Sequence, residues 1–527
     1  METALILHLP AKDSQTPDTF QHTLDSIFSQ TNALHAVVAL AGENSIDLPA
    51  DYSDSILVLQ SEGENLSYQL NQALDDLDTD YIIYLDNQAN PVILKNACLD
   101  MFYLAAHRNP DAGLIYADYE LLDGDELKEI HLLNHHNGRL RDNQDYGKVF
   151  FFDRDALDQV YGFDESLEYN TLYDIRLKLS ENCKLVRLAN KYNGSLYRVL
   201  AAGKEANVFD YLLAGKDVQL EAEAVLSEHL KRTHSYLEPG AEYQSRLEEK
   251  DESELVASII IPVNNRPEFM APAIASVQDQ TVKDIEVIIV VNGGKDDPTI
   301  PEVKRYMEGG DLFAAKKPAV QLVVVDINNI GFCLNMGVRY ARGKYYVQLD
   351  SDDRLKPDAL EKIVAEFEKD NQIGMVIGSY EVWEKQDSGE LVRREDIPVV
   401  THDEWTEENG RNNLLRINGA GAPRSIPLQI IKSMGYFGIN DEPFAQNYGE
   451  DYDMVLHISE KYKIGRIHDP IYEVIRHSGG TDHSIDQVTI DRNDEAKDRM
   501  RLKAIQRRKD RYSIDGKQFK NRGRFIR

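Results

Sequence analysis

Residues 345–355 read Y-Y-V-Q-L-D-S-D-D-R-L, an apolar run that leads directly into three acids, Asp350, Asp352 and Asp353. Residues 81–90 read Y-I-I-Y-L-D-N-Q-A-N, with the same apolar run but only the first of those acids. Short runs rich in aromatic and β-branched residues, bounded by polar residues, are typical of strands. We therefore interpret both stretches as buried strands, of which one keeps its acids and the other has lost two of them.

Similar apolar runs recur along the chain and alternate with segments of helical length. They occupy residues 3–9, 35–40, 55–60 and 80–85, and then 256–263, 286–292, 321–326 and 344–349. Continuous apolar strands separated by helices indicate βαβ units around a mostly parallel sheet that is buried on both faces. The predicted fold class is therefore α/β, with helices flanking mostly parallel central sheets.

The series of strands occurs twice. A shift of 264 residues aligns three pairs without a gap: Asn65 with Asn329, Asn71 with Asn335, and Asp86 with Asp350. Further along, D-I-R-L-K-L-S-E at Asp174 aligns with D-M-V-L-H-I-S-E at Asp453. Such internal similarity predicts two related domains in tandem.

The two copies differ where polar groups could carry chemistry. Gln88 and Ala89 replace Asp352 and Asp353, Thr171-Leu172 replace Glu450-Asp451, and, after a one-residue gap, Arg198-Val199 align with Arg476-His477. The apolar framework is kept in both copies. We therefore expect a first domain that is structural, or that binds a ligand without turning it over.

The acids after residue 349 lie where ligands bind in open α/β sheets, at the carboxyl ends of the strands. Clustered carboxylates become tolerable when Mg²⁺ or Mn²⁺ neutralises them, and these ions take further oxygens from a diphosphate. The alternative is a solvated turn that caps the next helix, since Pro357 follows as an early helix residue.

Glu450 and Asp451 open a helix expected over residues 451–462, where the helix dipole favours acids whatever their function. The first copy opens the same helix without acids, so folding does not require them. A lone histidine such as His477 is more often a packing or surface residue than a ligand. The valine aligned with it in the first copy favours a functional role.

Composition limits the class of protein. The chain has 527 residues, 42% of them hydrophobic and 28% charged, which is typical of a folded, water-soluble protein. No run of about 18 apolar residues and no signal peptide is found, so we expect a cytoplasmic protein. Cys98, Cys183 and Cys333 form neither a disulfide framework nor a zinc pattern and are expected to be buried packing residues.

The charge is unevenly distributed. The net charge of -31 argues against nucleic acid as a partner, because nucleic-acid binders present a basic face. Residues 497–527, however, carry 13 Lys and Arg against 3 Asp. This basic tail would suit a peripheral contact with the anionic inner face of the cell membrane, or it is a solvated helix. Both interpretations stay open.

Five ordered motifs carry a family resemblance. They are S-I-I-I-P-V-N-N-R-P-E-F, A-I-A-S-V-Q-D-Q-T, E-V-I-I-V-V-N-G-G, the long segment from Asn329 to Asp353, and G-E-D-Y-D at 449–453. Together, over residues 256–480, they resemble the family 2 inverting glycosyltransferases of GT-A fold. Residues 3–200 resemble the same fold with its motifs worn away.

The resemblance implies a site, position by position. It implies that Asp451 is the general base, with Glu450 beside it, and that Asp352 and His477 contact a Mn²⁺ or Mg²⁺ ion. The implied nucleotide contacts are Pro262, Asn264, Asn265, Arg266, Glu268, Asn292, Asn329, Asn335, Asp350 and Ser351. Asn264 stands where the family often has Tyr, and Asn292 where it often has Asp, which leaves the identity of the base open.

The resemblance also implies an activity. A sugar would pass from a nucleotide-diphosphate donor to an acceptor hydroxyl with inversion, on a glycan or lipid-linked acceptor, in bacterial surface polysaccharide or glycoconjugate assembly. One alternative is an inactive glycan-binding scaffold with two pseudo-transferase domains. Another is a sugar-nucleotide pyrophosphorylase, although P-V-N-N-R-P-E replaces the glycine-rich loop expected there.

The predicted domain organisation follows from the repeat. Residues 1–203 form a degenerate GT-A-like domain, and residues 204–254 a bridge with a helix at 210–234 and an acidic linker. Residues 255–480 form the catalytic GT-A domain, and residues 481–527 a basic helical tail.

Overall fold

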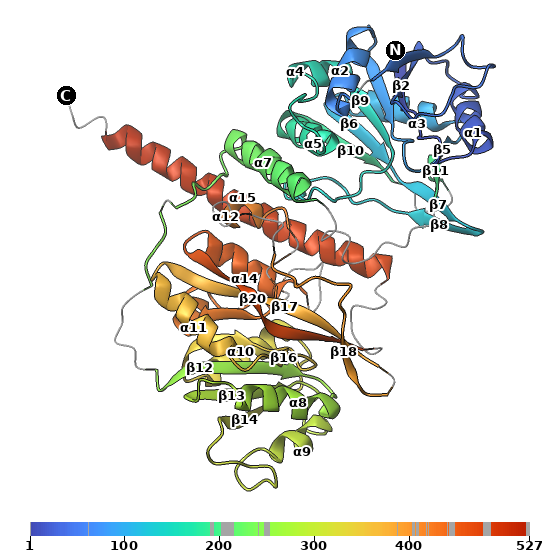
Figure 1. Ribbon diagram of the computed structural model, residues 1–527. Helices are drawn as coiled ribbons and strands as arrows, with labels where there is room; N and C mark the ends of the chain where they lie inside the picture. Colours follow the sequence, from blue (N-terminus) through green and yellow to red (C-terminus); the bar gives the residue numbers. More distant parts are fainter. Residues whose placement is uncertain are drawn as a thin grey trace. The chain divides into compact units, whose positions relative to one another are not determined.

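The chain divides into two compact units, Met1–His234 and Ser235–Arg527, which are described separately (Figure 1). The computed structural model describes residues 2–61, 63–189, 194–201, 215–240, 242–246, 253–386, 388–402, 406, 410–417, 419, 421–439, 441, 448–477 and 486–522. The predicted domain boundaries at 203/204 and 480/481 lie outside these described residues.

The first unit contains two sheets in its described residues. The larger has the order β10-β6-β9-β4-β1-β2-β3, with β9 antiparallel to both of its neighbours and all other pairs parallel. Its strands are β1 Thr3–His8, β2 Ala36–Ala41, β3 Leu57–Gln60, β4 Tyr81–Leu85, β6 Ala112–Ala117, β9 Val149–Asp153 and β10 Lys184–Leu188. The smaller, of order β5-β11-β7-β8, consists of β5 Val92–Leu94, β7 Tyr119–Asp123, β8 Glu126–Ile130 and β11 Tyr197–Leu200.

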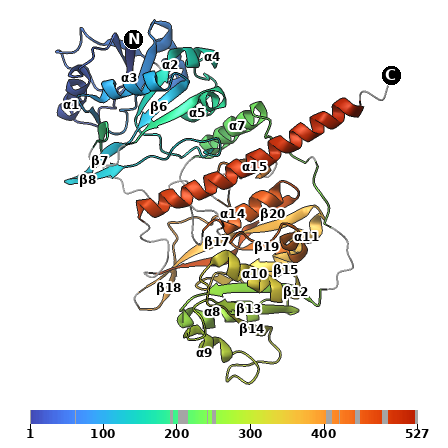
Figure 2. The same ribbon diagram turned by 180° about the vertical axis from the view of Figure 1, so that it is seen from behind.

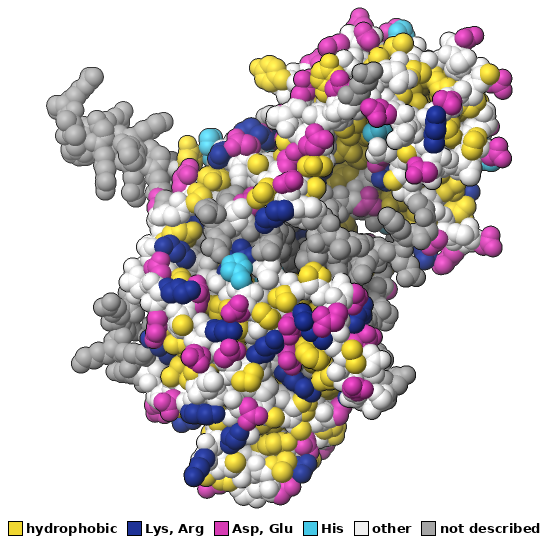
Figure 3. Space-filling model, in the orientation of Figure 1, with side chains coloured by type: hydrophobic (Ala, Val, Ile, Leu, Met, Phe, Trp, Pro, Cys, Tyr) yellow, Lys and Arg dark blue, Asp and Glu magenta, His cyan; other side chains and the backbone are white. Residues whose placement is uncertain are grey.

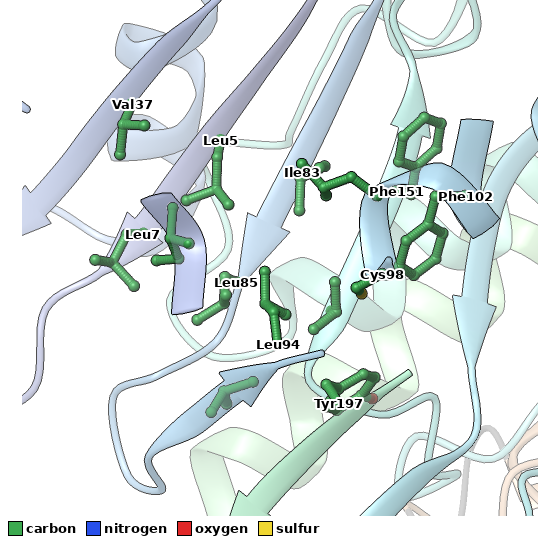
Figure 4. Packing of buried hydrophobic residues seen from close by; sticks show 14 of the residues in the cluster. Leu5, Leu7, Val37, Ile83, Leu85, Leu94, Cys98, Phe102, Phe151 and Tyr197 are labelled. Atoms are coloured by element: carbon green, nitrogen blue, oxygen red, sulfur yellow. The ribbon is translucent and has the colours of Figure 1, made fainter. Parts of the chain in front are cut away.

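Helices cover both faces of the larger sheet. They are α1 Pro17–Phe28, α2 Leu66–Asp75, α3 Cys98–Arg108, α4 Arg154–Gln159 and α5 Thr171–Asn182, and α7 Lys216–Arg232 packs on α5. On one face Leu5 and Ile83 pack with Phe102 and Phe151, whose rings stack at 5.4 Å (Figure 4). Each such side chain contributes about 1.5–3 kcal/mol when fully buried.

The second unit is built around one large mixed sheet. Its order is β14-β13-β12-β15-β19-β17-β20-β16, with β18 paired to β17. The strands are β12 Leu255–Val263, β13 Ile285–Val291, β14 Ala319–Val324, β15 Gly343–Gln348, β16 Arg354–Leu355, β17 Ile373–Lys385, β18 Leu391–Arg393, β19 Arg424–Pro427 and β20 Lys463–Arg476. The helices are α8 Pro267–Gln278, α9 Thr299–Lys304, α10 Ile330–Tyr340, α11 Ala359–Lys369, α12 Gly410–Asn413, α13 Leu428–Ser433, α14 Glu450–Ser459 and α15 Gln487–Arg522.

The two units share one topology. The order β14-β13-β12-β15-β19-β17-β20 repeats β3-β2-β1-β4-β9-β6-β10, with the same parallel and antiparallel pairs. The ladder β16-β20-β17-β18 likewise repeats the small sheet β5-β11-β7-β8. The difference is that β17 and β20 run unbroken through both ladders, whereas the first unit splits each into two strands. The α/β class with mostly parallel sheet cores is confirmed.

Two asparagines hold each unit in the same way. Asn65 and Asn329 cap α2 and α10. Their Oδ1 atoms accept hydrogen bonds from the backbone amides of Tyr68 and Phe332, at 2.9 and 2.8 Å. The Asn335 side chain bonds both backbone groups of Phe437, each at 2.9 Å. Asn71 bonds Phe163 in the same way, also at 2.9 Å. The repeat found in the sequence is therefore partly a repeat of structural asparagines.

The tail helix belongs to the repeat. In the second unit α15 packs on α14, as α7 packs on α5 in the first (Figure 2). Arg507 of α15 binds Glu460 at 2.7 Å, and Arg232 of α7 binds Glu181, the corresponding residue, at 2.8 Å. Arg501 is fully buried and donates to the Ile417 carbonyl at 2.7 Å. A purely solvated helix is thus the wrong interpretation for the part of α15 up to Tyr512.

Surface charge differs between the two units. On the face shown in Figure 3, acidic side chains predominate over the first unit, whereas basic and acidic side chains are interspersed over the second. Among the described residues, no helix is long and apolar enough to cross a membrane. Cys98 and Cys333 are buried as predicted, but Cys183 is only partly buried.

Candidate active site

The three acids after β15 have separate environments, which explains how three carboxyls can lie so close together in the sequence. Asp350 is half-buried and accepts a hydrogen bond from Gln348 Nε2 at 3.1 Å. Asp353 accepts the Ile475 amide at 2.8 Å and is 7% exposed. Burial raises the pKa of both carboxyls. Asp353 therefore ties the end of β15 to β20 and is a structural member of the cluster.

Asp352 is the acid of this cluster that meets charged partners at the rim. Its Oδ2 lies 2.8 Å from an Arg266 guanidinium nitrogen and 3.2 Å from His477 Nε2. The His477 ring packs on Phe269, with ring centroids 4.7 Å apart. The side chains of Asp352 and His477 are 21% and 11% exposed. The structure thus brings together two of the predicted site residues that are 125 positions apart.

The loops after β12 and β13 meet at the same edge of the sheet. Asn264 Nδ2 donates to Asn292 Oδ1 at 2.7 Å. Asn265 has a left-handed backbone, with φ of 50°, and its amide donates to Asp297 Oδ2 at 2.9 Å. Burial alone would raise the pKa of Asp297, but hydrogen bonds from Thr299, Asn265 and Gly293 lower it. Sequence reasoning missed Asp297, which fixes the shape of these loops.

The remaining predicted nucleotide contacts fall into three groups. Pro262 is buried within β12, and Ser351 is 6% exposed beside the acids. Glu268 is exposed in the first turn of α8. Asn329 and Asn335 bind the loop at 437–439 through their side chains, Asn329 at the Ile439 carbonyl. This geometry favours a structural role for the two asparagines over contact with a nucleotide.

The helix α14 presents the second pair of acids. It begins after Gly449, which has φ of 89°. Asp451 Oδ2 lies 2.9 Å from an Arg424 guanidinium nitrogen, and Asp451 Oδ1 accepts its neighbour's amide at 2.7 Å. Glu450 is 7% exposed, and burial, followed by the charge of Asp451, raises its pKa to about 8. The two adjacent carboxyls therefore have different environments: Glu450 is buried, whereas Asp451 is paired with Arg424.

Arg424 is the second residue that sequence reasoning missed. It lies at the start of β19 and is surrounded by Asp451, Asp350, Glu450 and the Tyr346 hydroxyl. Burial lowers the pKa of its guanidinium, but these carboxyls outweigh burial and raise it. Arg424 could have been identified by aligning residues 147–153 with residues 421–427, two segments that both begin with glycine.

The first unit closes the corresponding edge with its own side chains. Asp86, the counterpart of Asp350, forms an ion pair with Lys148 at 2.6 Å. Gln15 Nε2 donates to the Asn87 carbonyl at 2.6 Å, and Ser67 bonds Thr171 at 2.9 Å where the second unit has Gly331 and Glu450. By strand register, Pro10, Ala11 and Gly42 replace Asn264, Asn265 and Asn292.

The register also corrects one alignment. Tyr197 pairs with Leu94 in the first unit as Tyr472 pairs with Leu355 in the second. Arg198 therefore corresponds to Glu473, and the prediction that Arg198-Val199 match Arg476-His477 is wrong. The sequence alone does not show which residues pair across strands, so the one-residue gap in this alignment could not be placed correctly. The true counterpart of His477 is residue 202, outside the described residues, so the comparison says nothing about His477.

The second unit is thus an α/β domain with separated acids at the carboxyl edge of a parallel sheet and an amide-lined loop pair beside them. Residues 258–418 match the family model described as Glycosyl transferase family 2. These residues form a glycosyltransferase domain of that family, as the motifs predicted.

Comparison with known proteins gives partial matches. The chain is 34% identical over 149 residues to a chondroitin synthase of Escherichia coli, covering 27% of this chain and 21% of that protein. It is 36% identical over 121 residues to a chondroitin synthase of Pasteurella multocida, covering 23% of this chain and 12% of that protein. The chain therefore spans about a fifth or less of the length of these relatives.

Among solved structures, the chain is similar to a mannosyltransferase of Pyrobaculum calidifontis in complex with GDP-Man and Mn²⁺. It aligns with 14% identity and a TM-score of 0.32, over 55% of this chain and 82% of that one. A TM-score of this size carries no argument about ligand or mechanism.

Proposed function

We propose that the second unit is a metal-dependent, inverting glycosyltransferase that moves a sugar from a nucleotide-diphosphate donor to an acceptor hydroxyl. The observation that carries this proposal is the pairing of Asp352 with His477 at 3.2 Å, at the same sheet edge as the Asp451–Arg424 pair. The family 2 domain over residues 258–418 supports the class of reaction.

The residues at this edge fit a divalent cation. Among the described residues no group of three or more His, Cys, Asp and Glu could hold a metal by itself. Mg²⁺ is usually held by one or two carboxylates together with substrate phosphates, and Mn²⁺ also accepts imidazole. Asp352 and His477 supply two such ligands with atoms close enough to share one ion. When bound, a divalent cation would stabilise the negative charge of the leaving diphosphate.

The other side chains have defined tasks in this proposal. Arg266, now on Asp352, would move to the donor phosphates when the ion binds. Asn264 and Asn292 would meet the base and ribose. Asp451 would take the proton of the acceptor hydroxyl as that oxygen attacks the anomeric carbon and the bond to the diphosphate breaks. General-base assistance of this kind is typically worth about 10² to 10⁴ in rate.

The acceptor and the first unit belong to the same proposal. The two relatives above are named as chondroitin synthases, which supports a glycan acceptor, free or lipid-linked, in polysaccharide assembly. The first unit would be a GT-A-like pseudo-transferase that positions this acceptor or binds another protein. Support comes from its shared topology and from the Asp86–Lys148 and Ser67–Thr171 contacts at its sheet edge.

The basic tail adds a weaker proposal. A peripheral contact with an anionic membrane would have to use basic residues of the tail other than Arg501, Arg507 and Arg508, which are bound within the second unit. Vesicle co-sedimentation with and without phosphatidylserine measures this contact directly.

Nucleotide release tests the enzyme. The purified chain is given a panel of nucleotide sugars with Mn²⁺ or with EDTA, beside Asp352→Ala and the matched first-unit variant Gln88→Ala. We expect release from one donor that requires the metal, is abolished in Asp352→Ala and is unchanged in Gln88→Ala. No release and no calorimetric binding of any donor would instead support the scaffold.

A further inference from the structure

One buried guanidinium joins the two acidic clusters of the second unit. Arg424 projects from β19, which pairs antiparallel with β15, so it lies beside the strand that leads into Asp350. Its side chain is 14% exposed, and its charge interacts with Asp350, Glu450 and Asp451. Such a cation has to be matched by buried carboxylates, because an isolated charge is costly to bury.

Arg424 holds the Asp451 carboxylate in a single orientation. The Arg424 contact fixes Oδ2 at 2.9 Å, and the Tyr452 amide fixes Oδ1 at 2.7 Å. Each oxygen keeps a second lone pair for an acceptor hydroxyl. Glu450, one residue earlier on the same helix, is only 7% exposed. It lies beside Gly331, where a Cβ would clash with the Gly438 carbonyl oxygen at 1.8 Å.

The first unit shows what the fold does without this cation. By strand register Phe150 occupies the position of Arg424. In the second unit Val347 pairs with Ser425, so the next residue, Gln348, lies opposite Arg424. In the first unit Tyr84, the counterpart of Gln348, pairs with Phe150. Phe150 belongs to the apolar core of that unit. The same helix opens there with Thr171 and Leu172, so an arginine at this strand position accompanies the acids and is not needed by the sheet.

We propose that Arg424 is a positioning residue that selects Asp451, and not Glu450, as the group that receives the acceptor proton. The inference rests on the proposed function. The acceptor oxygen bonds to the anomeric carbon, the bond from that carbon to the diphosphate oxygen breaks, and the hydroxyl proton passes to Asp451. Arg424 holds that carboxylate in the orientation that its contact with Oδ2 sets. The raised pKa of Glu450 agrees with a neutral partner.

Arginine replacement tests the role in turnover. We compare Arg424→Met, Arg424→Lys and Arg424→Ala with Arg342→Met, which removes another ion-paired arginine of the same unit, held by Glu286 at 2.8 Å. Misplacing a reacting group by about 1 Å can cost about 10² in rate. We expect kcat of Arg424→Met to fall by about that factor while the donor KM stays within about threefold, with Arg424→Lys intermediate. Added guanidinium should restore Arg424→Ala but not Asp451→Asn.

The orientation of Asp451 is tested without turnover. A crystal structure of Arg424→Met should show the Asp451 carboxylate displaced or in more than one rotamer, with the fold of the unit maintained. An unmoved Asp451, or a kcat loss without guanidinium rescue, overturns the inference. Silence of the wild-type chain with every donor defeats the proposed function instead, and the crystal structure still decides whether Arg424 positions Asp451.

Discussion

The two units have one strand order and two different sheet edges. Their ladders agree strand for strand, and both keep a lysine-glutamate pair behind the edge, Lys95–Glu120 and Lys356–Glu381. At the edge itself the second unit has a cation between carboxylates, and the first has Phe150, the Ser67–Thr171 contact and a single acid, Asp86, paired with Lys148. A fold of this kind therefore tolerates removal of most of the acidic cluster, provided that the vacated positions are paired or filled.

The exchange of Glu450 for Thr171 shows how such removal is accommodated. In the first unit Ser67 and Thr171 bond each other at 2.9 Å in a buried contact. In the second unit Gly331 stands at the position of Ser67, and the acid Glu450, which is 7% exposed, stands at the position of Thr171. Because a buried carboxyl is costlier than a hydroxyl pair, the second unit gives up stability at this point. Such a sacrifice is expected at functional sites.

The largest expected difference between the units is catalytic. Asp451→Asn should lower kcat by about 10² to 10⁴, because the amide cannot accept the acceptor proton. The matched change Leu172→Asn in the first unit should leave kcat within about twofold. Steady-state nucleotide release measures both. An equal loss in the two variants would show that the first unit also carries chemistry.

The second prediction concerns the tail helix. Arg501→Met leaves Asp498, which is 0% exposed, without its ion-pair partner at 2.5 Å, and breaking a buried pair costs about 3–5 kcal/mol. Urea unfolding of the second unit should register this loss. The double variant Arg501→Met/Asp498→Leu should recover most of it.

The third prediction is a pH dependence that comes from Glu450. Its pKa is about 8 in the folded chain and near 4.5 when unfolded, so the unfolded state releases its proton first and stability falls as pH rises from about 4.5 to 8. Glu450→Gln removes this penalty and should stabilise the second unit by roughly 4 kcal/mol at pH 8. At pH 4 the gain should vanish. Thermal unfolding at the two pH values, with the exposed Glu268→Gln as control, measures it.

Most of the fold could be predicted from the sequence, and less of the site. Buried parallel strands are continuous apolar runs, so each of the eight predicted runs is a strand in the structure. The acids after β15 and at α14 could also be found locally, because each group is nearly contiguous in the sequence. Arg424 and Asp297 were not, because their partners come from other strands and loops, and an isolated arginine has no periodic signature.

The register error at Arg198 has the same origin. A gap in a repeat can be placed only by the residues that pair across strands, and those pairs join Tyr197 to Leu94 and Tyr472 to Leu355. The asparagines were found correctly but interpreted through the resemblance, whereas their bonds to Phe163 and Phe437 are equal in the two units. What the repeat keeps in both copies is more safely attributed to folding than to the ligand.

The smallest expected effect tests that attribution. Asn71→Ala and Asn335→Ala each remove a side chain that satisfies both backbone groups of a loop phenylalanine, and each should destabilise its own unit by about 1–3 kcal/mol. Donor affinity should stay unchanged in both, since the oxygen and the nitrogen of each amide already bond a loop phenylalanine. Unfolding curves and donor titration calorimetry separate the two roles. A loss of donor affinity in Asn335→Ala alone would return this residue to the nucleotide site and leave Asn71 as its structural remnant.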